Sequence, residues 1–399
     1  MRENIILLSS EPTSANFAVL LISIRATYPD STIFYVFKSR NEDEYNKYNG
    51  IVKDGVHYIT CRNFFEEKYL KIFRGKCITV FHKLVDYIYC KVSPCLNMIM
   101  YSKYEKILRK MSLNIVDKHN VKILFSSNNP YQAHKAAYYI SRKRSIIWNQ
   151  FWLDPLFQKP VSSRLNIIDR CKIHLEKKLF NKASKILVLP EAHRYDPIIN
   201  KYGDRVHEVE IPYITNRAIS NSSSDIIFAG SFVKRLREPE PIFPILKEAL
   251  HRLDEEIRFV FYVKDRSLYE AVETSSLGRI RFYDYIPREE LELLQSKATA
   301  LMSIGNLNSC QMPSKVVEYI SYRKPILFFY VDSNDSSFRY FKEYPNVCYV
   351  NINDDVSLNV EKLVKFMKAP LQQVTYEALL EVELFRRSTP EFMANIILN

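Results

Sequence analysis

Short apolar segments recur along the chain, and most of them are followed by a stretch in which apolar residues have helical spacing. Segments that are apolar on both faces and alternate with helices predict parallel sheets covered by helices on both sides. In the first half we expect strands at 5–9, 32–37, 121–126, 145–150 and 186–189, and helices at 15–26 and 133–142.

The pattern stops at residues 215–224, the one stretch rich in Ser and Asn, and restarts at 225. The second half predicts strands at 225–229, 258–263, 279–283, 300–303 and 325–329, and helices at 242–253, 268–274, 288–297 and 314–321. A length of 399 residues is too great for one ordinary core. We therefore expect an α/β chain of two tandem doubly wound Rossmann-like domains with a cleft between them. The expected bounds are 1–215 and 225–375, with a helix in 376–399 that returns to the N-terminal domain.

The composition is that of a globular protein, with 47% hydrophobic and 26% charged residues. No apolar run is long enough to span a bilayer, and the N-terminal residues resemble a first strand more than a secretory signal. The seven cysteines show no CxxC spacing, so neither a zinc site nor a disulfide framework is indicated. We expect a cytoplasmic protein in a reducing compartment.

Positive charge is concentrated in the first half. Residues 1–215 hold 34 Lys and Arg against 20 Asp and Glu, a net charge of +14, whereas the remainder holds 23 against 25, a net charge of −2. Such asymmetry favours a polyanionic partner for the first half, although a lysine-rich chain whose charges are merely solvated is the alternative. Nucleic acid ranks last among the partners, because no recognisable nucleic-acid motif is present.

The segment 64–89 interleaves basic and aromatic residues, among them Lys68, Lys71, Arg74 and Lys76. Such a segment suits the surface of an anionic membrane, at the inner face of the plasma membrane. A helix with core aromatics and solvated lysines is an equally good account.

Several enzyme classes lack their motifs in this sequence. There is no GxGxxG and no GxxxxGK[ST], and seven glycines leave little room for such loops. HExxH and GxSxG are also absent, which removes the main support for a zinc protease and for an α/β-hydrolase.

The segment 302–327 carries the clearest chemistry. A strand is expected to end near Ile304, and Pro313 stands where a helix would begin, followed by Ser314 and Lys315. The free N–H groups and positive dipole of a helix N-terminus favour phosphate, and a hydroxyl and an ammonium would complete a diphosphate cradle. Glu318 lies about one turn further on, where its carboxylate suits a ribose diol. Ordinary helix capping and a surface Lys–Glu ion pair remain the alternative.

This segment resembles the donor-binding signature of bacterial GT-B glycosyltransferases, especially family-4-like enzymes of capsule and surface-polysaccharide clusters. The matching residues are Ile304, Gly305, Asn306, Gln311, Pro313, Ser314, Lys315, Glu318, Tyr319, Ile320, Lys324, Pro325 and Ile326. The run 226–239 resembles the strand and Gly-Ser loop of the same enzymes, and the runs 123–134, 146–156 and 175–191 are similar to their first-domain segments. The resemblance covers residues 121–330 well and the ends more loosely.

The resemblance implies that the second domain binds a nucleotide-sugar donor and that the first binds a glycan or lipid-linked acceptor. We expect donor contacts from Gly230, Ser231, Lys234, Arg237, Tyr285, Pro313, Ser314, Lys315 and Glu318. Acceptor contacts are expected from Asn128, Gln150 and Asp154, and catalytic contacts from Asn306, Gln311 and His134. For His134 and its first-domain neighbours, a capping or core polar residue is the alternative. We expect no metal and no cofactor besides the donor, because Lys315 with Arg237 or Lys234 would stabilise the leaving diphosphate.

The sequence departs from the family pattern at one position. Better-known members carry two glutamates eight residues apart, and the first of these would fall at Cys310. Nucleotide binding through Glu318 is retained, whereas the group that contacts the sugar changes, and retention of anomeric configuration rests on the resemblance alone. The sequence therefore predicts a glycosyltransferase of surface-polysaccharide biosynthesis. A sugar-nucleotide epimerase of the same architecture and a catalytically degenerate nucleotide-sugar-binding protein remain as alternatives.

Overall fold

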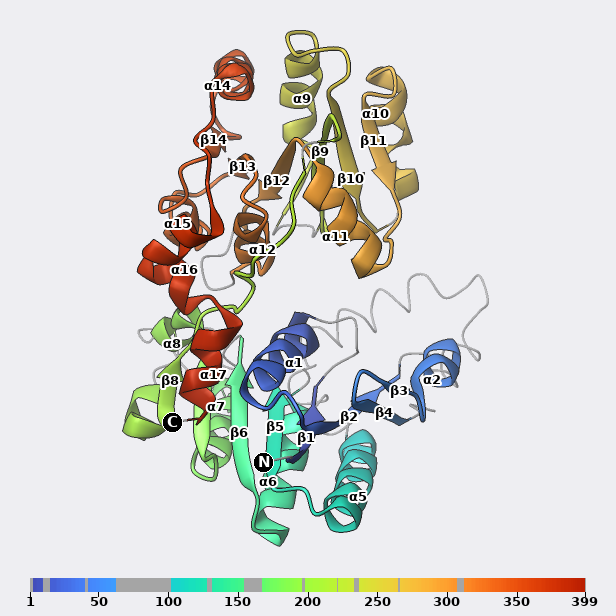
Figure 1. Ribbon diagram of the computed structural model, residues 1–399, viewed down its shortest axis with the longest axis vertical. Coiled ribbons are helices and arrows are strands. Elements are labelled where there is room, and N and C mark those ends of the chain that lie inside the picture. The colour runs from blue at the N-terminus through green and yellow to red at the C-terminus, as the bar shows by residue number, and fades with distance from the viewer. Residues whose placement is uncertain are drawn as a thin grey trace. The chain divides into compact units, whose positions relative to one another are not determined.

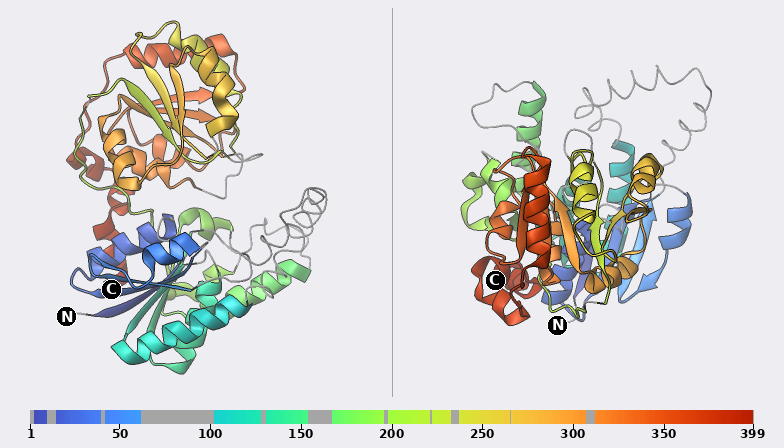
Figure 2. Two further views of the ribbon diagram at one scale, coloured as in Figure 1. Left: turned by 90° about the vertical axis from the view of Figure 1, so that its right-hand side faces the viewer. Right: turned by 90° about the horizontal axis from the view of Figure 1, so that it is seen from above.

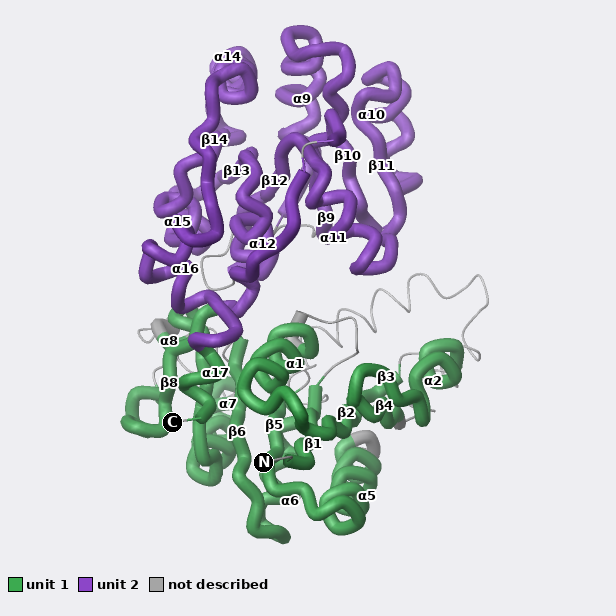
Figure 3. Tube along the Cα trace, viewed as in Figure 1, with its two compact units in different colours: residues 1–210, 393–399 green, residues 211–392 purple. Residues whose placement is uncertain are grey.

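The computed structural model describes residues 3–9, 15–39, 42–61, 102–127, 131–153, 167–195, 198–220, 222–232, 237–264, 266–306 and 312–398. The chain divides into two compact units (Figure 3). The first unit comprises residues 1–210 and 393–399, and the second comprises residues 211–392. Each unit is built on its own β-sheet.

Within the described residues, the sheet of the first unit has eight strands in the order β3-β4-β2-β1-β5-β6-β7-β8. All neighbouring strands are parallel except β3 and β4. The chain thus winds outward from β1 in one direction and from β5 in the other. The strands are β1 (Asn4–Leu8), β2 (Thr32–Lys38), β3 (Val52–Lys53), β4 (Val56–Cys61), β5 (Ile123–Ser127), β6 (Ile147–Trp152), β7 (Lys185–Val188) and β8 (Val206–Glu208).

Helices cover both faces of this sheet. The left view of Figure 2 shows α1 on one face and α5 and α6 on the other. Alternation along the strands explains the two layers: Phe34 and Val36 of β2 join the core under α5 and α6, whereas Tyr35 packs against Phe17 of α1. The helices are α1 (Ala15–Thr27), α2 (Glu42–Tyr48), α5 (Ser102–His119), α6 (Gln132–Lys143), α7 (Ile167–Phe180) and α8 (Pro190–Tyr195), with a 3₁₀ helix η2 (Ile199–Arg205).

The last helix, α17 (Pro390–Leu398), brings the C-terminus to the first unit. Lys185 at the start of β7 donates from Nζ to the carbonyl oxygens of Ile396 and Ile397, at 2.8 and 2.9 Å. A cation at these carbonyl groups complements the negative end of the helix dipole. The Ser23 hydroxyl of α1 contacts the Met393 sulfur at 2.8 Å.

The described part of the second unit contains a sheet of six parallel strands in the order β11-β10-β9-β12-β13-β14. The winding direction reverses between β9 and β12, which lie side by side in the middle of the sheet (Figure 1). The strands are β9 (Asp225–Ala229), β10 (Arg258–Tyr262), β11 (Ile280–Tyr283), β12 (Ala300–Ile304), β13 (Ile326–Tyr330) and β14 (Val347–Asn351).

The helices of the second unit pack on a core that is rich in aromatic rings, with Phe243, Phe261 and Phe282 in mutual contact. The helices are α9 (Ile242–Leu250), α10 (Glu270–Ser275), α11 (Arg288–Lys297), α12 (Lys315–Ser321), α13 (Phe338–Phe341), α14 (Val356–Lys368), α15 (Tyr376–Glu381) and α16 (Glu383–Arg387), with a 3₁₀ helix η3 (Arg266–Tyr269).

The Ser/Asn-rich segment 215–224 is bound to the end of α12. Ser321 bonds the backbone of Thr215 in both directions, Arg323 donates to the carbonyl of Arg217, and Lys324 donates to the carbonyl of Ser220. Burial lowers the pKa of Lys324 to about 8. The segment therefore belongs to the second unit, and the chain crosses between the units at residues 210–211.

Both sheets have the doubly wound order, so the prediction of two tandem Rossmann-like domains is confirmed. Within the described residues, no helix is long and apolar enough to cross a membrane.

Candidate functional site

The point at which the winding reverses in the second sheet brings two loops together. Gly230 and Ser231 follow β9, and Gly305 and Asn306 follow β12. Ligands of doubly wound sheets bind beyond the carboxyl ends of the strands at such a point. These loops therefore form the candidate site.

A hydrogen-bonded chain joins the loops after β9, β12 and β13. The Arg237 guanidinium donates from Nη2 to Asn306 Oδ1 at 2.7 Å, and the Asn306 N–H donates to Asp335 Oδ2 at 2.5 Å. Asp335 also accepts the N–H of Ser337 at 2.7 Å. Burial raises the pKa of Asp335, while the bonds from Ser337 and Asn306 and the charge of Arg237 oppose that rise. The Arg237 guanidinium is thereby held at the switch point.

Gly305 allows the close approach on which this chain depends. A Cβ atom at Gly305 would lie 2.5 Å from Asp335 Oδ2 and 3.3 Å from the Phe328 ring. A side chain at residue 305 would therefore force Asp335 or the loop to shift, so glycine is favoured there for a steric reason.

Glu318 on α12 is a buried carboxylate between two cations. Its side chain is 4% exposed, and its oxygens lie 2.9 Å from Lys315 Nζ and 4.0 Å from Arg288 Nη2. Burial raises the pKa of Glu318, but Lys315 and then Arg288 outweigh it and hold the pKa below its ordinary value. Glu318 is therefore ionised at neutral pH although it is buried.

The start of α12 differs from ordinary capping. The side chain of Ser314 accepts no N–H group of the helix, and Pro313, Ser314 and Lys315 are all partly exposed. The Lys315–Glu318 pair is also no ordinary surface ion pair, because its carboxylate is almost fully buried. Neither feature tests the donor role of Pro313, Ser314, Lys315 and Glu318, which stays a prediction.

Tyr319 fixes α12 against the end of β9. Its hydroxyl accepts the Ala229 N–H at 3.1 Å and faces the Ala229 carbonyl oxygen at 3.4 Å. The next residue is Gly230, and the hydroxyl of Ser231 lies 2.7 Å from that of Tyr285, which follows β11. The structure thus brings Gly230, Ser231, Arg237, Tyr285 and Asn306 to one edge of the sheet, and Tyr319 ties α12 to it.

No protein-family model and no curated protein sequence matches this chain. Several solved structures are similar to it over its whole length. HepE of Anabaena, solved with UDP and glucose, is 10% identical with a TM-score of 0.58, and the alignment covers 100% of this chain and 98% of that one. A glycosyltransferase from Rickettsia africae is 10% identical with a TM-score of 0.57, covering 100% and 97%. A UDP-N-acetylglucosamine 2-epimerase is 10% identical with a TM-score of 0.51, covering 97% of each chain.

The chain has the GT-B fold. The prediction of a GT-B glycosyltransferase-like architecture is confirmed at the level of the fold, which both glycosyltransferases and sugar-nucleotide epimerases share.

Two site residues predicted in the first GT-B domain lie in its core. His134 is fully buried, its Nδ1 lies 2.7 Å from the Ser126 hydroxyl, and its ring lies tilted against that of Trp152, at 4.5 Å between centroids. Gln150 is also fully buried, and its amide bonds the carbonyl of Leu179 and the indole N–H of Trp152. These are the surroundings of core polar residues, and a functional role for either residue stays a prediction.

Four of the predicted site residues lie outside the described part of the chain. They are Asn128, Asp154, Lys234 and Gln311, together with Cys310 at the position of the missing glutamate. Among the described residues there is no cluster of His, Cys, Asp or Glu that would hold a metal ion.

Sequence reasoning missed three residues that contact the candidate site. Arg288 begins α11 and contacts Glu318, the Tyr213 ring and Glu292. Asp335 and Tyr213 also take part, but neither lies near a recognised motif. Arg288 follows Pro287 at the start of an amphipathic segment, so a helix N-terminus was readable there, but its partner on another element was not.

Proposed function

We propose that this chain is a glycosyltransferase that moves a sugar from a nucleotide-sugar donor to a lipid-linked glycan in surface-polysaccharide biosynthesis. The second domain would bind the donor, and residues 1–215 would bind the acceptor, with the contacts predicted from the sequence. The family-4-like signature at 304–326 supports this choice over other chemistry that uses the GT-B fold.

The buried Glu318 carboxylate between Lys315 and Arg288 is the observation that carries the proposal. A carboxylate is removed from water at a free-energy cost, and Lys315 and Arg288 offset that cost here. Its place one turn below the start of α12, at the switch point of the sheet, suits a ribose diol that donates two hydrogen bonds.

The donor diphosphate would lie at the start of α12. The N–H groups of the first turn, the Ser314 hydroxyl and the ammonium of Lys315 are donors of the kind that phosphate oxygens accept. Arg237, held through Asn306, would add a second cation from the opposite loop. Because these groups balance the charge that develops on the leaving diphosphate, we propose that the reaction requires no metal ion.

Incubation with a panel of UDP-, GDP-, ADP- and dTDP-sugars, followed by NMR, tests the proposal. We expect release of the nucleoside diphosphate from one donor, faster when a membrane extract supplies acceptor, and within a few-fold the same rate in the presence of EDTA. Failure to bind or turn over any donor would contradict the proposal. Binding without turnover would favour the degenerate binding protein.

A sugar-nucleotide epimerase is the second candidate, because a UDP-N-acetylglucosamine 2-epimerase is among the proteins with the same fold. It makes a different prediction in the same NMR experiment. An epimerase would convert UDP-N-acetylglucosamine to its C2 epimer with no acceptor present.

A further inference from the structure

The outer layer of three helices on the first sheet forms one continuous face. Helices α5, α6 and α7 all contribute to a single core that also contains Leu124, Trp148 and Ile186 from the sheet. Leu108 of α5, Ala136 of α6 and Leu179 of α7 belong to that core, so the three helices cover the same side of the sheet. Their other sides face outward.

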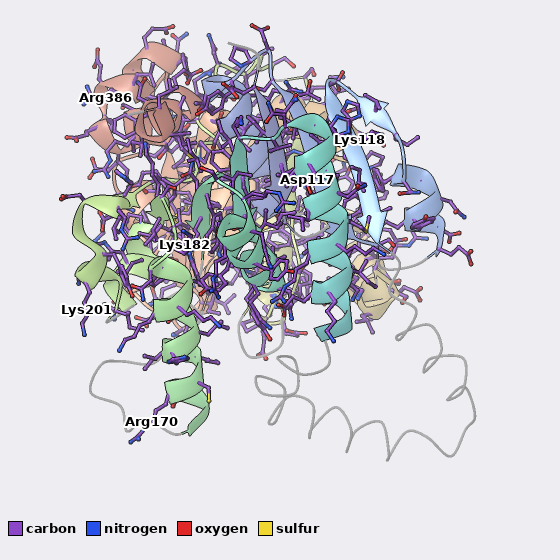
Figure 4. The ribbon with its side chains drawn as sticks, turned by 90° about the horizontal axis from the view of Figure 1, so that it is seen from below. Asp117, Lys118, Arg170, Lys182, Lys201 and Arg386 are labelled. Atoms are coloured by element: carbon purple, nitrogen blue, oxygen red, sulfur yellow. The ribbon has the colours of Figure 1, made fainter. Side chains whose placement is uncertain are left out.

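Cations dominate the outward side of this layer. Residues 102–119, 132–144 and 167–182 hold 14 Lys and Arg against four Asp and Glu, a net charge of +10. Three of the four acidic residues, Glu105, Asp169 and Glu176, are buried, and the fourth, Asp117, is exposed but paired with Arg144. The exposed cations, which we call the basic helical face, are Lys106, Lys110, Lys118, Arg142, Lys143, Arg144, Arg170, Lys177, Lys178 and Lys182 (Figure 4 labels three of them).

Burial of the acidic residues makes this excess effective at the surface. Glu105 forms ion pairs with Arg109 and Lys135, which are themselves half-buried. Its negative charge is therefore balanced by these two cations and does not offset the exposed ones. The exposed set has ten cations and one acidic residue among the described helices. A surface with that imbalance attracts polyanions over about a Debye length.

Two half-buried tyrosines lie between these cations. The Tyr139 ring lies under Arg109 and Lys143, at 4.7 and 5.8 Å from its centroid, and the Tyr138 ring lies near Lys178 at 5.2 Å. Amphipathic rings beside long cationic side chains are typical of protein surfaces at a lipid headgroup layer. Because cations already cover these rings, they offer no platform on which bases of a single strand would stack.

We propose that the basic helical face docks on an anionic lipid membrane. The proposal rests on the charges of the first domain and is independent of the reaction in the second. It differs from the predicted segment 64–89, which lies outside the described residues.

Vesicle sedimentation tests this proposal with a charge-matched control. The face variant changes Lys106, Lys110, Arg142 and Lys143 to Gln, and the control variant changes Lys264, Lys342, Lys365 and Lys368 of the second unit, all exposed, to Gln. On vesicles of phosphatidylcholine with about one third phosphatidylglycerol, we expect the partition coefficient of the face variant to fall about 100-fold or more, because each basic residue near an anionic leaflet contributes appreciably. The control should bind as the wild type does, and raised salt should release the wild type.

Two outcomes would overturn the proposal. One is equal loss of vesicle binding in both variants, or none in either, because the effect would then not belong to this face. The other is a wild type that does not bind anionic vesicles at low salt but binds an oligonucleotide through the same four residues. Circular dichroism and nucleotide binding on the same samples show whether each variant is folded, and they separate this result from any failure of the donor site.

Discussion

At the scale of single residues, the balance around Glu318 depends on Arg288 as well as on Lys315. Arg288 lies 4.0 Å from the carboxylate and is itself held by Glu292 at 2.9 Å and by the Tyr213 ring. The charge of Glu318 also helps to raise the pKa of Arg288, against the effect of burial. We therefore infer that Arg288 is a positioning residue, which together with Lys315 lowers the pKa of Glu318.

The variant Arg288→Gln should change the pH dependence of nucleotide binding. Burial raises the pKa of Glu318 and the nearby cations lower it. Removing one of these cations should therefore raise the pKa. Because the wild-type pKa lies below the ordinary value of 4.5, the affinity for a nucleoside diphosphate should fall only below that pH in the wild type, and at a higher pH in the variant. Calorimetric titration from neutral pH to below pH 4.5 measures the shift, and Arg252→Gln, which breaks an exposed pair between the turn after α9 and Glu248 of α9, serves as the control. Identical pH profiles for Arg288→Gln and wild type would refute the role given to Arg288.

His134 should make the fold sensitive to acid. Burial lowers its pKa from 6.5 to about 3, so the folded state keeps it neutral while the unfolded state takes up a proton below about pH 6.5. This stabilising contribution is present above pH 6.5 and is lost as pH falls toward 3, at up to about 1.4 kcal/mol per pH unit. Urea unfolding at several pH values should show that the free energy of unfolding changes less steeply with pH for His134→Phe than for the wild type. Equal slopes would mean that His134 reaches solvent in the folded protein.

At the scale of elements, local pattern predicted much of the second sheet. The strand Asp225–Ala229 and the helix Arg288–Lys297 have the predicted bounds. The helix expected at 242–253 ends at Leu250, because residues 251–253 form a turn, and the one expected at 268–274 is split into η3 and α10. The helices α5 and α14 were not predicted.

The part of the site that sequence could predict is the part that is local. Pro313, Ser314, Lys315 and Glu318 lie within six consecutive residues and share a recognisable signature. Asp335 and Arg288 meet that segment only through the order of strands in the sheet, which no local pattern encodes.

The hairpin at Asp54 and Gly55, both at positive φ, did carry a readable Asp-Gly turn signal.

The loop after β12 depends on the missing side chain of Gly305. The variant Gly305→Ala should lower the free energy of unfolding by about 1–3 kcal/mol, because its Cβ would overlap Asp335, which the N–H groups of Asn306 and Ser337 hold in place. Urea unfolding measures the loss, and a double-mutant cycle with Asp335→Ala tests its cause. The double variant should lose less than the sum of the two single variants. Full additivity would show that the two residues do not interact.

At the scale of the whole molecule, the two halves of the chain differ in net charge, so we expect them to attract anions in different ways. Residues 1–215 carry a net charge of +14, much of it on the basic helical face, whereas the remainder carries −2. The second unit therefore has no general attraction for a nucleotide diphosphate, and the proposed donor site depends on a few cations placed by the sheet. Salt should accordingly weaken membrane binding more than donor binding.

Calorimetry with nucleoside diphosphates tests the central claim most directly. Among UDP, GDP, ADP and dTDP, the wild type should bind at least one, and Glu318→Gln and Lys315→Ala should each weaken that binding by about 1.5–3 kcal/mol, because each removes a charge-assisted hydrogen bond. Glu361→Gln, which changes an exposed glutamate of α14, should bind as the wild type does. Unchanged affinity in both site variants would contradict the assignment of the donor site to α12.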